Sequence, residues 1–193
     1  MHYQKAKKYA IGRLHKELPS NLYYHGIHHT LDVCQAAQSL AEQEKVGSEE
    51  RTLIATAALF HDIGFIEQYL DNEPIACRIA TDYLPKCDYN VGQVKQVCDM
   101  IMATRLPQSP LSKLAEILCD ADLDYLGRED FFEIADTLKR EWMQMDFISS
   151  DTEWNKKQLG FLSSHTYFTE SAMVNRDVGK QTNFLALQKI LGI

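Results

Sequence analysis

Apolar residues recur at spacings of three and four along most of this chain, and no stretch alternates steadily between apolar and polar positions. Such spacings place apolar side chains on one face of an α-helix, whereas alternation would indicate a half-buried strand. Helix start signals, such as Asn72 and Glu73 before Pro74, and stop signals, such as Gly127, divide the pattern into segments. We predict an all-α fold of about eight or nine helices, over residues 3–17, 27–45, 48–62, 72–84, 90–104, 110–126, 129–145, 151–165 and 172–191.

Composition is that of an ordinary globular chain. The 193 residues are 45% hydrophobic and 24% charged, with only 9 glycines and 5 prolines, which argues against a turn-rich all-β protein. This length favours a single domain over residues 1–193. The longest apolar stretch, Leu53 to Phe60, is far shorter than the roughly 20 residues that span a bilayer. The net charge of −7 argues against a nucleic-acid duplex or an anionic membrane surface as a general partner.

The cysteines give no sign of a disulfide framework. They are odd in number and contain no Cys-x-x-Cys pair, which also argues against a thiolate zinc site. The basic start of the chain is followed by neither an apolar segment nor a small-residue cleavage site. We therefore expect a cytoplasmic protein with reduced thiols at positions 34, 77, 87, 98 and 119.

Candidate chemistry is found by asking which polar residues lie on apolar helix faces, because a buried polar group needs a partner. His29 shares a face with Val33 and Leu40, whereas His28 lines up with the polar Asp32. His29 is therefore predicted to point inward and His28 outward. His25 lies on the same side as His29 only if the first turn of the helix reaches back past Gly26. A single inward histidine such as His29 is also compatible with an ordinary core residue.

A second candidate is the pair His61-Asp62, which ends a segment that is apolar nearly all round. Burying both side chains there requires a compensating charge. The pair can reach one ion if the last turn is distorted, which Gly64 permits. The alternative is a histidine interacting with the helix dipole beside a solvated aspartate.

The third candidate lies in the run Asp120, Asp122 and Asp124. Residues two apart in a helix point to nearly opposite sides, so these acids cannot share one role. Asp122 falls in the stripe of Leu111 and Leu118, while Asp120 and Asp124 are predicted to lie on the surface, with Asp124 paired to Arg128. The inward set is thus His29, His61, Asp62 and Asp122. Two imidazoles and two carboxylates suit a single divalent cation, with Mn, Fe, Mg, Co, Ni and Zn as candidates.

These residues also carry a resemblance. The stretches 24–33 (YHGIHHTLDV), 59–64 (LFHDIG) and 120–123 (DADL) resemble the HD-domain superfamily of metal-dependent phosphohydrolases, named for its adjacent His-Asp pair. Residues 161–169 (FLSSHTYFT) are similar, more weakly, to the C-terminal part of some HD proteins. The resemblance implies an HD-type helical bundle with its metal-site core at about 20–130 and helices of 131–193 packed on it. It implies His29, His61, Asp62 and Asp122 as ligands of one ion.

The resemblance also has departures. In related cyclic-nucleotide phosphodiesterases a histidine at the position of His25 protonates the leaving group, but here Gly26 follows where Asn is more usual. Two-metal relatives use further histidines, and none occurs here between positions 61 and 165. Glu73 is a candidate for acting on a water or on a second, weak ion. Phe65 replaces the lysine that follows His-Asp-x-Gly in the cyclic-di-GMP branch.

The expected activity is metal-dependent hydrolysis of a phosphate ester, of either the monoester or the diester type, on a nucleotide or another small phosphorylated metabolite. His25, Asp62 and Glu73 are the catalytic candidates: Asp62 or Glu73 takes a proton, and His25 gives one. Phosphate contacts are expected from basic residues, namely Arg105, Lys113 and Arg128. The alternative is a non-catalytic HD module that binds a nucleotide or metal. An iron oxygenase would need more histidines. We expect a monomer or homodimer, with the apolar cluster around Trp142 in the core.

Overall fold

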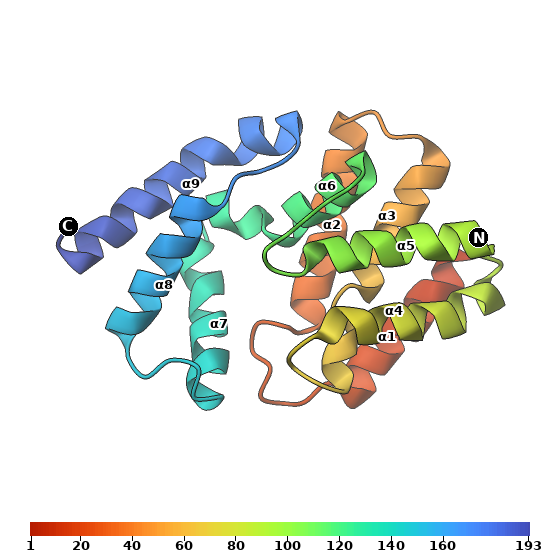
Figure 1. The fold of residues 1–193 in the computed structure, drawn as a ribbon, viewed down its shortest axis with the longest axis horizontal. Coiled ribbons are helices and arrows are strands. Elements are labelled where there is room, and N and C mark those ends of the chain that lie inside the picture. The colour runs from red at the N-terminus through yellow and green to blue at the C-terminus, as the bar shows by residue number, and fades with distance from the viewer. The chain divides into compact units, whose positions relative to one another are not determined.

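The computed structural model describes residues 1–193 and is entirely helical, as predicted from the sequence. No strand occurs, and no helix is long and apolar enough to cross a membrane. Nine α-helices and three short 3-10 helices make up the fold: α1 (Tyr3–Glu17), α2 (Ile27–Gln43), α3 (Ser48–Phe60), η1 (Ile63–Ile66), α4 (Asn72–Tyr83), η2 (Leu84–Cys87), α5 (Val91–Thr104), α6 (Lys113–Asp122), η3 (Asp124–Gly127), α7 (Phe131–Gln144), α8 (Asp151–Ser164) and α9 (Glu170–Leu191) (Figure 1).

The chain forms two compact units. The first comprises Met1–Pro19 and His25–Asp122, and therefore holds α1 to α6. The second comprises Ser20–Tyr24 and Leu123–Ile193, and holds η3 and α7 to α9. The single domain over 1–193, with residues 131–193 packed on the metal-site core, stays a prediction.

Helix α3 is the centre of the first unit. It packs against α1, α2, α5 and α6, which are seen around it in Figure 1. All residues from Leu53 to Phe60 are buried, as their apolar character predicts. Ala55, Ala57 and Ala58 carry little side-chain bulk, so the neighbouring helices approach closely. The end of α3 is consequently held from several sides.

The helix expected over 110–126 is shorter than predicted at both ends. Ser112 starts α6, because its Oγ accepts a hydrogen bond from the Ala115 amide at 3.2 Å, so the cap signal at Ser109-Pro110 is not the one used. Leu111 lies outside the helix and is 99% exposed. After Asp122 the chain tightens into η3, which removes the register assumed for Asp124.

The second unit is built around η3 and α9. Glycine is required where the two meet, because a Cβ on Gly179 would lie 2.0 Å from the carbonyl oxygen of Gly127. Above this contact, Asn183 donates to the carbonyls of Leu126 and Arg128 at 2.9 and 3.0 Å. These contacts attach α9 to the turn that follows Asp122.

The apolar cluster around Trp142, predicted to lie in the core, does so only in part. Trp142 packs against the buried Trp154, with ring centroids 5.5 Å apart, and borders the core of the second unit. Met143 and Phe147 are exposed instead.

Candidate metal centre

Three helix ends in the first unit bring the inward histidines and aspartates together. His29 lies in the first turn of α2, and His61 with Asp62 follows directly after the last residue of α3. Asp122 is the last residue of α6. The distorted turn expected after α3 is present, since Asp62 precedes the 3-10 helix η1. Adjacent His61 and Asp62 can therefore reach the same point.

The two imidazole nitrogens lie at nearly equal distances from each other and from one oxygen of each carboxylate. The two histidine Nε2 atoms are 3.3 Å apart. Asp122 Oδ1 lies 3.2 Å from His29 Nε2 and 3.4 Å from His61 Nε2. Asp62 Oδ2 lies 3.4 and 3.2 Å from the same two atoms. His29, His61 and Asp122 form a group whose ligand atoms all lie within 4.8 Å of one another.

A divalent cation fits this donor set. Neighbouring donors around one ion with bonds of about 2.0–2.2 Å lie about 3.0–3.6 Å apart, as these do. Asp62 Oδ2 is buried and makes no hydrogen bond despite its two imidazole neighbours. The His61 ring is held by a hydrogen bond of 2.8 Å between its Nδ1 and the Ala58 carbonyl, which leaves the Nε2 lone pair facing the cluster.

The phase predicted for the first histidines is confirmed. His29 is 6% exposed and His61 1% exposed, whereas His28 is exposed on the outer face of α2. The burial of His29 follows from its position on the apolar stripe of α2, next to the helices that pack there.

The phase predicted for the acidic run is half wrong. Asp122 faces the cluster, but Asp120 is fully buried rather than solvated, because α6 is covered by α2, α3 and α5. Asp124 is also buried. Its carboxylate accepts two hydrogen bonds from the guanidinium of Arg176, at 2.7 and 3.0 Å. The predicted ion pair between Asp124 and Arg128 is also present, with a longer separation of 3.9 Å. The distant Arg176 gives no local signal in the sequence.

The cluster strongly shifts the ionisation of its members. Burial lowers the pKa of His29, but the contacts with Asp122 and Asp62 outweigh it and raise the pKa to about 9. Burial acts likewise on His61, and the same two carboxylates raise its pKa well above the usual value. Burial raises the pKa of Asp62, but the imidazoles hold it well below the usual range. Without a cation the cluster therefore holds bound protons near neutral pH.

His25 lies beside this cluster but outside the helix. Helix α2 begins at Ile27, with Gly26 as its extended N-cap residue, so His25 is not on the first turn. Its ring stacks on Phe65 at a centroid distance of 4.1 Å and meets the edge of Tyr69 at 5.6 Å. It lies 6.1 Å from the His29 ring. Sequence reasoning missed the ring contacts of His25 with Phe65 and Tyr69. The only signal in the sequence is that His61, Phe65 and Tyr69 recur at intervals of four residues.

Glu73 approaches the cluster because η1 and the start of α4 lie in close contact. A Cβ on Gly64 would lie 2.0 Å from the carbonyl oxygen of Asn72, so the packing requires glycine there. Burial raises the pKa of Glu73, and the negative charge of Asp62 adds to that shift. The Oδ1 atom of Asn72 is buried with no hydrogen-bond partner, which makes it a further polar atom near this end of α4.

The three residues predicted to contact phosphate lie in different environments. Arg105 is half-exposed and paired with Asp71, and its charge acts on Glu73. Lys113 is paired with Glu44 at 2.9 Å. Arg128 belongs to the second unit, where Asp130 accepts two of its hydrogen bonds at 2.9 and 2.6 Å. Only Arg105 is linked electrostatically to the candidate site.

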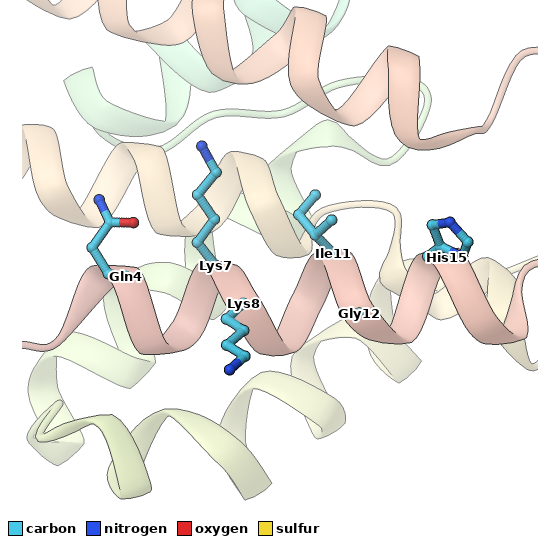
Figure 2. A pocket seen from close by; sticks show the side chains of 6 residues that line it. All are labelled: Gln4, Lys7, Lys8, Ile11, Gly12 and His15. Atoms are coloured by element: carbon cyan, nitrogen blue, oxygen red, sulfur yellow. The ribbon is translucent and has the colours of Figure 1, made fainter.

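A surface hollow of about 530 Å³ lies elsewhere on the first unit (Figure 2). It contains none of the predicted site residues. Figure 2 shows Lys7 and Lys8 pointing to opposite sides of α1. The hollow is lined entirely by residues of α1: Gln4, Lys7, Lys8, Ile11, Gly12 and His15.

Comparison with known proteins agrees with this site. Residues 26–124, just over half of the chain, match the family described as HD domain. The chain belongs to the HD-domain family. HD domains bind divalent metals, and the His29, His61 and Asp122 group has the composition of such a site. HD hydrolases act on phosphorylated small molecules.

One solved structure supports the same fold. It is the crystal structure of a predicted HD superfamily hydrolase from an uncultured Thermotogales bacterium, with a TM-score of 0.63 and 21% sequence identity. The match covers 95% of this chain and 88% of that chain. No curated protein matches the chain.

Substitutions at neighbouring positions test the metal site. We expect His29→Ala to abolish tight binding of a divalent cation, because it removes one of two imidazole donors, while His28→Ala leaves binding unchanged. Asp122→Ala and Glu116→Ala, both on α6, form a second pair with the same contrast. Elemental analysis of each purified variant, normalised to about one ion per native chain, provides the measurement. Equal loss within a pair, or two full-occupancy ions in the native protein, would contradict the assignment.

Metal binding is also expected to release protons. An imidazole must be neutral to bind a cation, and the pKa of His29 without metal is about 9. Affinity should therefore rise with pH up to about 9 and fall as pH decreases. Titration calorimetry at neutral pH, in buffers with different ionisation enthalpies, should give about two released protons per ion, one from each imidazole. Binding with no proton release would show that the metal-free histidines are neutral.

Proposed function

We propose that this protein is a metal-dependent phosphohydrolase acting on a phosphate ester of a nucleotide or another small phosphorylated metabolite. The observation that carries the proposal is the cluster of His29, His61, Asp62 and Asp122, in which each imidazole Nε2 lies 3.2–3.4 Å from an oxygen of both carboxylates. A purely structural module has no need of such a set, because paired burial of charges is usually no more stable than apolar packing.

The four side chains would contribute two kinds of donor to the ion. His29 and His61 present neutral nitrogen donors, while Asp62 and Asp122 supply negative charge that offsets the cost of burying the cation. When bound, a divalent cation supplies the charge that acidifies a water and neutralises a phosphoryl oxygen. The hydrogen bond from His61 Nδ1 to the Ala58 carbonyl keeps that ring in a fixed orientation.

Glu73 is the better of the two candidate proton acceptors. The contacts with the imidazoles hold the pKa of Asp62 well below its usual range, which makes Asp62 a weak base suited to metal binding. Burial raises the pKa of Glu73, which makes its carboxylate the stronger base. We therefore propose that Glu73 accepts the proton of the attacking water and that Asp62 is a metal ligand.

His25 is assigned as the proton donor to the leaving oxygen. Its ring is close enough to Asp62 for its charge to lower the pKa of that carboxyl. Stacking on Phe65 holds the imidazole at the edge of the cluster, where it is half-exposed and can meet a substrate. Such a donor must exchange its proton with solvent and must point toward the leaving oxygen. Stacking on Phe65 fixes the orientation of the His25 ring.

Arg105 is our first choice for a phosphate contact. Its guanidinium is half-exposed, and Asp71, at the N-terminus of the helix that carries Glu73, keeps it near the site. Guanidinium groups bind phosphate through two parallel hydrogen bonds. Lys113 and Arg128 remain weaker candidates, since of the three residues only Arg105 acts electrostatically on Glu73.

A substrate screen tests the function. The native protein, loaded in turn with Mn²⁺, Mg²⁺, Fe²⁺, Co²⁺, Ni²⁺ and Zn²⁺, is assayed against phosphomonoesters, phosphodiesters and nucleotides, with phosphate or alcohol release as readout. We expect turnover of one ester class that His29→Ala abolishes and His28→Ala retains. A metal-loaded protein that binds nucleotides without turning any ester over would identify a non-catalytic binding module instead.

A leaving-group series tests His25. If His25 protonates the leaving oxygen, His25→Ala should retain the metal and lose about 10²- to 10⁴-fold in turnover on alkyl phosphate esters. The loss should shrink for nitrophenyl esters, because nitrophenolate leaves without protonation. Loss of metal would make His25 a ligand, and a uniform deficit across leaving groups would make it a positioning residue.

A further inference from the structure

Two of the five free thiols, Cys77 and Cys98, face each other across the contact between α4 and α5. The Cys77 thiol lies 3.5 Å from the carbonyl oxygen of Cys98, and the Cys98 thiol lies 3.6 Å from the carbonyl oxygen of Cys77. The two thiols are close enough for each to shift the pKa of the other. This reciprocal placement brings both side chains to one spot on two helices that are already packed.

The two thiols are chemically unlike each other. The hydrogen bond from Cys77 lowers the pKa of Cys98 to about 7, although burial opposes this shift. The hydroxyl of Thr81, 3.7 Å from Cys98 Sγ, acts in the same direction. The same hydrogen bond raises the pKa of Cys77, and burial adds to it. Cys98 is thus the thiolate-forming partner and Cys77 the one that keeps its proton.

Solvent exposure distinguishes Cys77 and Cys98 from the other three cysteines. Cys77 and Cys98 are half-buried, so a small solute can reach them. Cys34, Cys87 and Cys119 are buried. Reactive cysteines combine thiolate character with partial exposure, and buried thiols in apolar surroundings are inert.

We propose that Cys77 and Cys98 form an oxidisable dithiol, which a peroxide converts into a disulfide joining α4 to α5. The proposal does not depend on the phosphohydrolase reaction. A disulfide requires that the two cysteines face each other at close range. Each thiol lies 3.5 or 3.6 Å from the carbonyl oxygen of the other residue, which places the two side chains face to face.

The chemistry balances with peroxide as the oxidant. The Cys98 thiolate attacks one peroxide oxygen, the O–O bond breaks, and the products are a sulfenic acid on Cys98 and hydroxide, or alkoxide from an alkyl peroxide. Cys77 sulfur then attacks the Cys98 sulfur, forming the S–S bond and expelling hydroxide, which takes the Cys77 proton and leaves as water. Sulfur is oxidised and peroxide oxygen reduced by two electrons, and a small dithiol reverses the change.

The bond would act on the helix that carries Glu73. Glu73 and Cys77 are four residues apart and therefore share a face of α4. The negative charge of Glu73 also acts on the Cys77 thiol. Oxidation therefore restrains the same face of α4 that approaches the metal centre.

Peptide mapping tests the proposal directly. The full-length protein, loaded with Mg²⁺ to avoid metal redox chemistry, is treated with hydrogen peroxide, and thiols are counted after denaturation. We expect five thiols to become three, with the remaining ones at Cys34, Cys87 and Cys119. Trypsin should release residues 52–78 and 96–105 as one linked species that separates on reduction, since each of these peptides contains a single cysteine.

Variants separate the two roles. Cys77→Ser should stop the reaction at a sulfenic acid on Cys98 that a dione reagent traps, whereas Cys98→Ser should leave Cys77 unreacted. Cys87→Ala serves as the control and should form the disulfide as the native protein does. Five thiols surviving peroxide, a link through any buried cysteine, or a link only between separate molecules would overturn the proposal. Circular dichroism confirms that each variant is folded.

Discussion

Two imidazoles, each 3.2–3.4 Å from two carboxylates, dominate the first unit. Each would be costly to bury alone, and their mutual contacts compensate only while all four are held together. Their carriers are the ends of α2, α3 and α6, so these helices must converge. The almost entirely apolar α3 makes this convergence possible, because it is covered on several sides and holds the His61 end in place.

The tight turn after α3 links this cluster to the second candidate group. Gly64 lies so close to the carbonyl of Asn72 that no side chain fits between them. Glu73 is therefore brought near Asp62, and the pKa values of the two carboxyl groups are shifted in opposite directions. The imidazoles keep the pKa of Asp62 low, whereas burial raises that of Glu73. One close backbone contact thus brings together two carboxyl groups whose pKa values are shifted in opposite directions.

The same helix connects the metal centre with the dithiol. Asn72 and Glu73 lie at the beginning of α4, and Cys77 follows one turn later against α5. A covalent change at the thiols therefore reaches the acidic end of the helix through a single rigid element.

The sequence by itself determined the helical class, the apolar character of α3, the inward phase of His29 and the set of four candidate ligands. All of these follow from local periodicity, which reports the face on which a side chain lies. Tertiary structure decided the rest. Asp120 and Asp124 look solvent-facing in a regular helix, yet α6 is covered by its neighbours and the chain tightens into η3. The partner of Asp124 is Arg176, more than fifty residues away, and Cys77 meets Cys98 only because α4 packs on α5. Periodicity describes one helix at a time, whereas burial and pairing depend on which other helix covers it.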